Sequence, residues 1–328
     1  MDDVLVIGGT RFIGRYTVSE FRDAGYDVTM FNRGTRANPF VDDEAVAHFE
    51  GNRRDRDALE DVHTAVDPDV VVDCVAYFPE DVRVATDVFA DVDAYVYVSS
   101  GAAYGEERVP KREDDTALEP CSDEQATTDS AETYGPRKAE GDREVFSAAE
   151  AGVRAMSVRP TVVYGPHDYT ERFAYWVDRV DVEDRVVVPG DGLSLWQMAY
   201  VEDVASALRL VAEAGTAGEA YNVGDEHAPM LGQWLDLLAE TCETGVETVG
   251  ATARDLARHG LEPQDFPMYR ASPHLLETAK LRALGWSSTP HRVALQRTVA
   301  EHRENERTGR QFGPDRETEG EILDALTE

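Results

Sequence analysis

The sequence predicts an α/β fold in which helices cover both faces of a parallel sheet. Three observations support this prediction. Short apolar, β-branched runs alternate with helical patterns through the first half of the chain. A glycine-bearing turn directly follows the first of these runs. The 328 residues, 42% of them hydrophobic, suffice for one large domain and a smaller lobe.

The elements follow in order from these patterns. The aliphatic run Val4–Ile7 predicts a buried strand, and a helix should follow the glycine turn to about Phe21. The acid- and turn-rich interval 105–129 is expected to be a loop. Beyond residue 165 the patterns become shorter and less regular, as expected for a separate lobe. The other predicted strands are 28–31, 46–49, 70–75, 95–98 and 153–163, and the other predicted helices are 55–66 and 130–151.

The chain is strongly acidic. It has 65 acidic and 32 basic residues, a net charge of −33, and the acids are spread along the sequence. A solvated, acid-coated surface suits high salt, which screens self-repulsion, so a salt-loving cytoplasm is our hypothesis. This charge argues against nucleic acid as a partner, because nucleic-acid binding needs a basic surface.

Composition also indicates where the protein works. Cys74, Cys121 and Cys242 are far apart and form no CxxC pair, so we expect reduced thiols rather than disulfides. No histidine pair has metal-ligand spacing, and no metal is expected. The start of the chain lacks the basic region of a signal peptide, and no apolar stretch is long enough to span a bilayer. We therefore expect a cytoplasmic protein without a membrane partner.

The segment Gly8-Gly-Thr-Arg-Phe-Ile-Gly14 lies between the first predicted strand and helix. Glycine allows the backbone to approach a pyrophosphate, and the N-terminus of the helix offers unpaired N–H groups and a positive dipole. A tight turn without a ligand is the alternative interpretation. The position of the segment, directly after the first strand, favours dinucleotide binding.

Tyr134 and Lys138 are four residues apart on a predicted helix and therefore share one face. A nearby ammonium group favours the phenolate form of tyrosine, so the pair has the chemistry of a general acid and base. An accidental pair on a solvated helix is the alternative. The chain has only three lysines and 13 tyrosines, which makes a chance pair at this spacing rare.

Several motifs together resemble extended short-chain dehydrogenases/reductases of the NAD-dependent epimerase/dehydratase family. The glycine segment resembles their GxxGxxG turn, with Arg11 in place of the central glycine, as in the atypical branch that includes chloroplast stem-loop-binding proteins. The motifs that carry the rest of the resemblance are VSSGAAYG at 98–105, RPTVVYGP at 159–166, YVEDVA at 200–205 and YNVG at 221–224.

The resemblance implies a Rossmann-type doubly wound parallel sheet with a smaller C-terminal substrate-binding lobe. It implies an NAD(P)-binding domain at 1–165 and a mixed α/β substrate lobe at 166–308, interleaved with the last Rossmann elements; residues 309–328 are expected to be a polar tail. The implied catalytic residues are Ser100, Tyr134 and Lys138. The implied contacts to the cofactor are Gly8, Thr10, Arg11, Phe12, Ile13, Gly14, Asn32, Arg33, Asn52, Ala76, Lys138 and Pro160.

The cofactor implied is NAD or NADP. Asn32 stands at the end of the second strand, where NAD-selective relatives usually carry an acid for the ribose hydroxyls. Arg33 offers a partner for a 2′-phosphate, so NADP is slightly favoured, although a surface arginine is an equal alternative. Asn52 stands where the family usually has the aspartate that contacts adenine.

The substrate lobe offers five further candidates. Trp196 stands where relatives that act on sugar nucleotides often carry an arginine, which suits a less phosphorylated ligand. Tyr164, Arg172, Tyr175 and Trp176 are candidates for the pocket lining, although core packing is the commoner role for any one aromatic residue.

The sequence therefore predicts an NAD(P)-dependent epimerase, dehydratase or reductase. Its small-molecule substrate would be a sugar, a nucleotide sugar or another hydroxyl or carbonyl compound. A non-catalytic nucleotide-sensing or RNA-binding protein of the atypical branch is the alternative. Family members often dimerise, so the resemblance also implies a homodimer.

Overall fold

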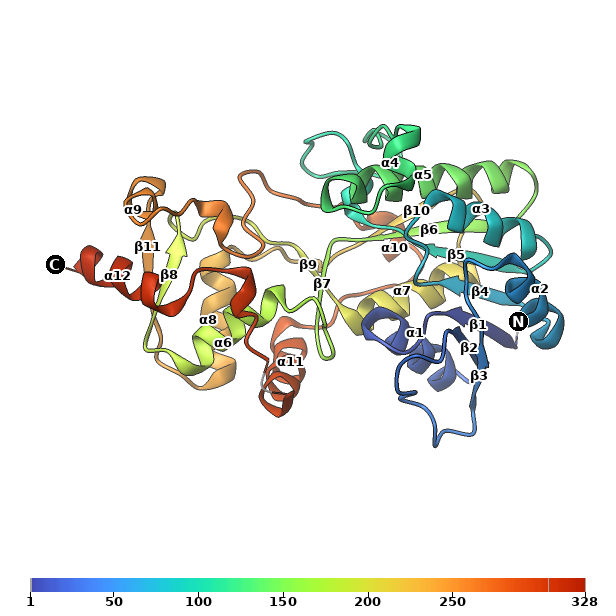
Figure 1. The fold of residues 1–328 in the computed structure, drawn as a ribbon, viewed down its shortest axis with the longest axis horizontal. Helices are drawn as coiled ribbons and strands as arrows, with labels where there is room; N and C mark the ends of the chain where they lie inside the picture. Colours follow the sequence, from blue (N-terminus) through green and yellow to red (C-terminus); the bar gives the residue numbers. More distant parts are fainter. Residues whose placement is uncertain (1, 306, 328) are drawn as a thin grey trace. The chain divides into compact units, whose positions relative to one another are not determined.

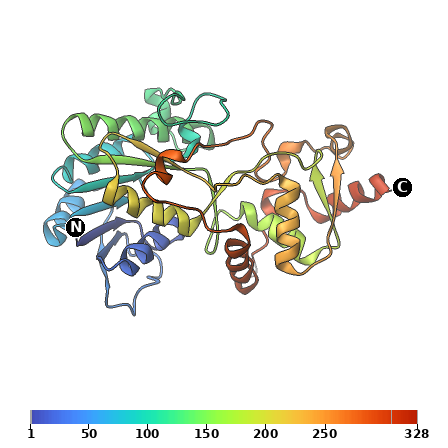
Figure 2. The ribbon, with the colours of Figure 1, turned by 180° about the vertical axis from the view of Figure 1, so that it is seen from behind.

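The computed structural model describes residues 2–305 and 307–327, which form two compact units (Figure 1 and Figure 2). We call unit 1 the segments Met1–Val163, Ala199–Glu226 and Leu276–Ser288. Unit 2 comprises Tyr164–Met198, His227–Leu275 and Thr289–Glu328. Unit 1 therefore includes two short segments from beyond residue 165.

Unit 1 is built on a seven-stranded sheet whose neighbouring strands are all parallel. The strand order is β10-β6-β5-β4-β1-β2-β3. The chain order reverses between β1 and β4, and ligands of doubly wound sheets bind beyond the carboxyl ends of the strands at such a point. The strands are β1 (Asp3–Ile7), β2 (Asp27–Asn32), β3 (Val46–Glu50), β4 (Val70–Asp73), β5 (Ala94–Val98), β6 (Ala155–Pro160) and β10 (Ala220–Val223).

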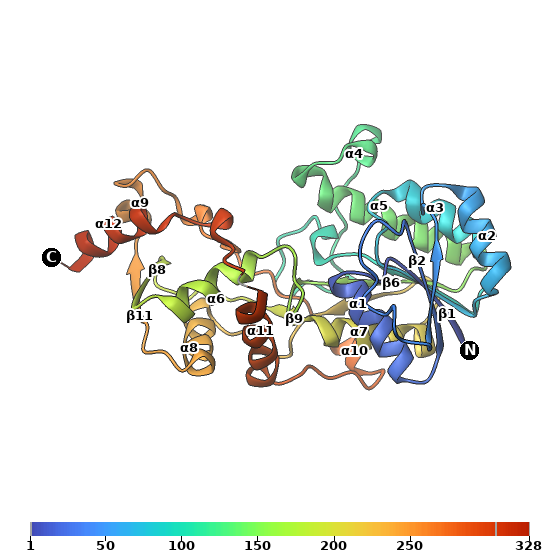
Figure 3. The same ribbon diagram turned by 60° about the horizontal axis from the view of Figure 1, so that its bottom comes forward.

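Helices cover both faces of this sheet, which confirms the predicted fold class (Figure 3). The helices α1 (Phe12–Asp23) and α7 (Val201–Ala214) pack together on one face. On the other face α3 (Pro79–Val88) packs against both α2 (Arg56–Val66) and α5 (Ala131–Glu150). Strands β4 and β5 are buried along their whole length, as the apolar runs at 70–72 and 95–98 predict.

Unit 2 contains a parallel strand pair, β8 (Arg185–Pro189) and β11 (Glu247–Ala251). Its longer helices are α6 (Arg172–Val182), α8 (Leu231–Cys242), α11 (His291–Asn305) and α12 (Arg316–Thr327). Two other helices are very short, namely α9 (Ala253–Ala257) in unit 2 and α10 (Ala279–Arg282) in unit 1. No helix of residues 2–305 and 307–327 is both long enough and apolar enough to cross a membrane.

Two predicted boundaries differ from the structure. The interval 153–163 is not one strand, because β6 ends at Pro160 and β7 (Val162–Tyr164) pairs with β9 (Met198–Tyr200) in a separate two-stranded sheet. The interval 105–129 is not a loop throughout, because α4 (Asp123–Thr127) forms there. Ser122 begins α4 by accepting a hydrogen bond from the backbone N–H of Gln125.

The segment 309–328, expected to be a polar tail, instead contains α12, which packs against β8. Ile322 and Leu323 are buried, and Glu319 is fully buried. The Glu319 carboxylate accepts hydrogen bonds from the Arg179 side chain at 2.7 Å and from the backbone N–H of Val187 at 3.0 Å. The polar sequence did not predict a packed helix, because a buried acid is stable only with a partner. That partner, Arg179, lies far away in the sequence.

Candidate active site

The glycine turn leads directly into α1 and brings backbone close to backbone. A β-carbon on Gly14 would lie 2.6 Å from the backbone nitrogen of Gly9, so only glycine allows this approach. Arg11 caps the helix in an extended conformation. Phe12 is buried, whereas Thr10 and Ile13 are half-buried. The tight turn and the helix N-terminus fit the pyrophosphate of a dinucleotide.

The side chain of Asn32, at the end of β2, is held on several sides. Its amide nitrogen donates to the Gly8 carbonyl at 3.3 Å, and its oxygen accepts from the Gly34 N–H at 2.9 Å. The Nε2 atom of His48 lies 3.1 Å from the same oxygen. Asn32 therefore ties the end of β2 to the glycine turn, and Arg33 next to it is exposed.

The ammonium group of Lys138 lies at the carboxyl ends of β4 and β5. Its Nζ atom donates hydrogen bonds to the carbonyl oxygens of Ala76 at 2.9 Å and Val98 at 2.8 Å. The side chain is only 3% exposed. A lysine has three N–H donors, so these two carbonyls leave one donor for a ligand. Ala76, a predicted cofactor contact, thus holds Lys138 through its backbone carbonyl.

Tyrosine rings surround this ammonium. Its Nζ atom lies 4.7 Å from the ring centre of Tyr97, 5.3 Å from that of Tyr77 and 5.9 Å from that of Tyr134. Burial lowers the pKa of Lys138 from 10.5 to about 8, although the carboxylates of Asp73 and Asp142 oppose the shift. The pKa of Lys138 therefore lies close to neutral pH, and the lysine can lose its proton far more easily than a solvated lysine.

Tyr134 lies half-buried in the first turns of α5, beside the turn that follows β5. A β-carbon on Gly135 would lie 2.6 Å from the carbonyl oxygen of Ala102, so glycine lets α5 pack closely onto this turn. The turn begins at Ser100, whose half-buried hydroxyl accepts from the backbone N–H of Ala102 at 3.1 Å. Ser100 thus comes from the turn after β5, and Tyr134 and Lys138 come from α5, which packs against this turn.

A buried ion network beside this site was not predicted. Asp73 ends β4 and is fully buried, where it pairs with the Arg53 guanidinium and accepts from the Tyr95 hydroxyl at 3.2 Å. Arg53 also pairs with Asp81 at 3.2 Å. The signal in the sequence was a lone acid closing the aliphatic run Val70–Val72, because such an acid needs a buried partner.

Arg137, next to Lys138, was also missed. Its guanidinium donates to the Tyr77 carbonyl and to the Asp129 carboxylate, each at 2.8 Å, and it stacks on the Phe78 ring at 4.6 Å. These contacts fix the segment that carries Tyr77, whose ring is 39% exposed. Its place directly before the predicted lysine was the only signal.

The other predicted cofactor contacts lie in the same unit. Pro160 is buried at the end of β6, and Asn52 is exposed in the turn between β3 and α2. Arg53, the residue after Asn52, lines a pocket of about 340 Å³ together with Phe78, Asp81 and other residues. All twelve predicted contacts therefore belong to unit 1.

The family model described as "NAD dependent epimerase/dehydratase family" matches residues 4–224. The chain belongs to this family. This match confirms the predicted resemblance to extended short-chain dehydrogenases/reductases.

Two curated relatives match most of the chain. The Arabidopsis thaliana "Chloroplast stem-loop binding protein of 41 kDa b" is 26% identical over 86% of this chain and 74% of its own length. The Haloferax volcanii "Low-salt glycan biosynthesis protein Agl12" is 28% identical over 87% of this chain and 93% of its own length. A human dTDP-D-glucose 4,6-dehydratase is 25% identical over 66% of this chain and 58% of its own length.

Solved structures of the epimerase/dehydratase family share the fold. A Thermotoga maritima UDP-glucose 4-epimerase with UDP-glucose aligns at a TM-score of 0.72 and 21% identity, over 93% of this chain and 99% of its own. A Bacillus anthracis dTDP-glucose 4,6-dehydratase in complex with NAD aligns at 0.73 and 20% identity, over 95% of this chain and 100% of its own. At these identities the likeness shows the fold.

The predicted substrate residues lie in unit 2, where their rings pack against other rings. Tyr164 contacts Phe173 and Trp234 edge to face, with ring centres 5.4 and 5.6 Å apart. Trp176 contacts Trp196 at 6.1 Å in the same manner. Tyr164, Tyr175 and Trp176 are fully buried, Trp196 is 5% exposed, and Arg172 is exposed. The four aromatic residues are core residues of unit 2, and ligand contact by any of the five stays a prediction.

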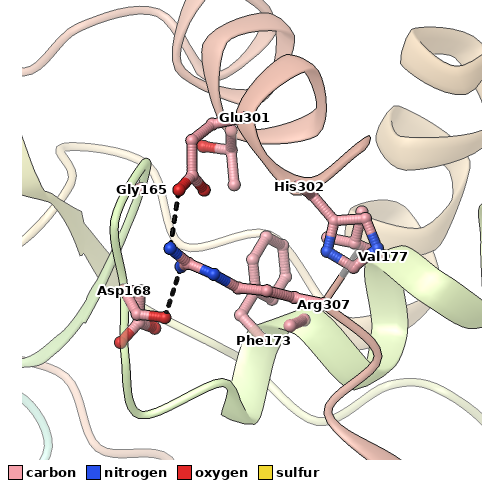
Figure 4. Close-up of a pocket in the computed structure, with 9 residues that line it drawn as sticks. Gly165, Asp168, Phe173, Val177, Glu301, His302 and Arg307 are labelled. Atoms are coloured by element: carbon pink, nitrogen blue, oxygen red, sulfur yellow. Dashed lines mark hydrogen bonds and ion pairs between the residues drawn. The ribbon is translucent and has the colours of Figure 1, made fainter. Parts of the chain in front are cut away.

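A small cavity in unit 2 is lined by charged side chains (Figure 4). Arg307 reaches between two partners, donating to the Asp168 carbonyl at 2.8 Å and pairing with Glu301 at 2.6 Å. The cavity holds about 20 Å³, room for one water molecule. Within residues 2–305 and 307–327, no group of three or more His, Cys, Asp or Glu residues is placed to hold a metal ion.

Proposed function

We propose that the protein is an NAD(P)-dependent epimerase, dehydratase or reductase in which Tyr134 moves the proton. The observation that carries this proposal is the Lys138 ammonium, buried between the Ala76 and Val98 carbonyls with the Tyr134 ring beside it. A protein that only binds a ligand has no need of a desolvated cation next to a phenol. Perturbed charges of this kind cluster at functional sites.

The chemistry assigned to the chain's own groups is proton transfer. The Tyr134 hydroxyl gives a proton to a substrate oxygen, or its phenolate takes one, and the positive charge of Lys138 favours the phenolate. Ser100 donates its hydroxyl hydrogen to the same substrate oxygen and so orients it. When bound, the nicotinamide supplies the hydride chemistry. The remaining N–H of Lys138 would hold its ribose, and the glycine turn would hold its pyrophosphate.

The substrate proposed is a sugar, a nucleotide sugar or another small hydroxyl or carbonyl compound. Support comes from the names of relatives, which include dTDP-D-glucose 4,6-dehydratases and a Streptomyces kanamyceticus 2'-dehydrokanamycin reductase. NAD accompanies solved relatives of the same fold. Arg33 is the residue on which a preference for NADP would depend.

A second candidate function is RNA or nucleotide binding without catalysis. The similarity to the chloroplast stem-loop binding protein over 303 residues favours it. Two observations oppose it, namely the net charge of −33 and the complete Ser–Tyr–Lys set. A labelled RNA stem-loop, titrated in the salt used for enzyme assays, tests this candidate, and saturable binding would support it.

Two further proposals concern the state of the protein. We propose that it works as a homodimer in the cytoplasm. Cys74, Cys121 and Cys242 are all free thiols, which suits a reducing compartment. Sedimentation at several protein concentrations tests the dimer, and a constant monomer mass would contradict it.

The test of the main proposal compares wild type with Tyr134→Phe in high salt. NADH and NADPH binding is followed by fluorescence, and turnover is assayed with UDP-glucose, dTDP-glucose and unphosphorylated sugars. We expect the variant to keep nucleotide affinity and to lose turnover on any compound that wild type converts. Tyr169→Phe, an exposed tyrosine of unit 2, is the matched control. Equal turnover by Tyr134→Phe and wild type would contradict the assignment.

A further inference from the structure

We propose that Glu50 makes the nucleotide site select NAD over NADP. The proposal rests on the proposed function in one respect, namely that a dinucleotide binds along the glycine turn. It reverses the slight preference for NADP that Arg33 suggested from sequence. The position of a second charge, which only the fold reveals, is the reason.

The fold places Glu50 beside the end of β2. Strands β2 and β3 are parallel neighbours, and Glu50 is the register partner of Asn32. A backbone hydrogen bond from Gly51 to the Asn32 carbonyl, 2.9 Å long, fixes this register at the last residues of both strands. Side chains of paired residues on neighbouring parallel strands point to the same face of the sheet. Glu50 and Asn32 therefore share a face at the carboxyl edge.

The Glu50 carboxylate lies directly over the turn that follows β2. A β-carbon built on Gly34 would lie 2.5 Å from its carboxyl carbon and 2.6 and 2.7 Å from its two oxygens. Gly34 has a φ angle of +63°, a conformation that favours glycine, and a side chain at this position would displace the Glu50 carboxylate. The acid that the sequence lacks at position 32 is thus supplied from the next strand.

This carboxylate is not neutralised by the neighbouring arginines. Arg33 and Arg36 are exposed, and within the described chain Glu50 forms no ion pair with them or with any other residue. The Asn32 amide cannot take over the role of an acid, because its oxygen already accepts from the Gly34 N–H and lies beside His48. Glu50, Arg33 and Arg36 are all exposed, and the Glu50 carboxylate lies against the Gly34 turn at the end of β2, where it places a negative charge.

The two cofactors differ only at the 2′ position of the adenosine ribose, which binds near the end of the second strand in such folds. A hydroxyl there donates a hydrogen bond to a carboxylate, whereas a phosphate carries negative charge and is repelled by it. Glu50 favours the hydroxyl on both grounds. The acidic net charge of −33 adds to the repulsion of the more highly charged nucleotide.

The test measures the dissociation constants of NADH and NADPH for wild type, Glu50→Gln and Glu44→Gln at one fixed salt concentration. Glu44 is another exposed glutamate of the same region, so its variant removes equal net charge away from the turn. We expect wild type to bind NADH more tightly than NADPH. We expect Glu50→Gln to lower the ratio of the NADPH to the NADH dissociation constant about five- to tenfold. Glu44→Gln should leave this ratio unchanged.

The possible outcomes separate this inference from the proposed function. Tighter binding of NADPH by wild type, or a ratio unaffected by Glu50→Gln, would overturn the role of Glu50 while leaving dinucleotide binding intact. An equal change in both variants would show a general charge effect and would also overturn it. Failure of wild type to bind either nucleotide would overturn the proposed function itself.

Discussion

The two units bury different kinds of side chain where their candidate functional residues lie. In unit 1 the carboxyl edge of the sheet buries charges, among them Lys138, Asp73 and Arg53. In unit 2 four of the five candidates are aromatic residues, and two of them, Trp176 and Trp196, contact each other. Buried charge is costly unless it is paired or used, whereas buried aromatic surface stabilises a core without any ligand. The case for a functional site is therefore stronger in unit 1.

The largest effect is expected from removing the buried charge of Lys138 in unit 1. Replacing Lys138 by Met removes the cation beside Tyr134 and should reduce kcat about 10²- to 10⁴-fold, the usual contribution of a general acid–base group. Lys280→Met is the control, because Lys280 pairs with Asp114 and Glu219 in the same unit. Steady-state kinetics on any converted compound provides the measurement. Similar losses in both variants would point to a general effect of lost lysine charge.

The buried ion pair of Arg53 and Asp73 gives the next effect, on stability. Asp73→Asn removes one of the two carboxylates paired with the buried Arg53 guanidinium, Asp81 being the other, and should lower the free energy of unfolding by about 3 kcal/mol. Glu60→Gln breaks the exposed pair with Arg56 and should cause no measurable change. Denaturant unfolding at constant high salt compares the two. A neutral Asp73→Asn variant would show that the pair is not needed for folding.

A substitution in unit 2 tests whether its buried aromatic residues stabilise the fold rather than bind a ligand. Trp176→Phe loses the hydrogen bond from the indole N–H to the Pro267 carbonyl, 3.2 Å long, and leaves that buried oxygen without its donor. We expect a loss of about 1–3 kcal/mol in stability and no change in NADH affinity. Thermal unfolding and a fluorescence titration test this. Unchanged stability with a raised KM would instead assign Trp176 to substrate binding.

The smallest expected effect is on pH dependence. The protonated form of Lys138 supports the Tyr134 phenolate, and burial sets its pKa at about 8. As pH rises above that value the lysine loses its charge, so kcat/KM should fall by about tenfold per pH unit. In Lys138→Arg the side chain keeps its charge at alkaline pH, so kcat/KM should no longer fall there. A profile that stays flat through alkaline pH would contradict the assignment.

The fold was predictable because local patterns and global topology agree. The aliphatic runs at 4–7, 70–75 and 95–98 are the central strands of the sheet, and the glycine turn, Ser100, Tyr134 and Lys138 all lie at or beside the carboxyl edge. The helix α12 was missed because its polar sequence hides one paired, buried acid, Glu319. Local composition does not reveal a partner 140 residues away.

The rest of the site could not be predicted for the same reason. Arg53 meets Asp73 20 residues later in the chain, and Tyr77 meets Lys138 only because α5 packs beside the end of β4. Glu50 reaches the Gly34 turn through the register of β2 and β3. Motifs identify residues that act on ligands, whereas the groups that set their charge come from other strands.

The most direct test of the account is the titration of Lys138 itself. The chain has only three lysines, so ¹³C labelling of their ε-carbons gives three signals, which Lys111→Arg and Lys280→Arg assign by elimination. We predict that the Lys138 signal titrates with a midpoint near pH 8. A midpoint at the ordinary lysine value of 10.5 would show a solvated ammonium and contradict the buried acid–base site.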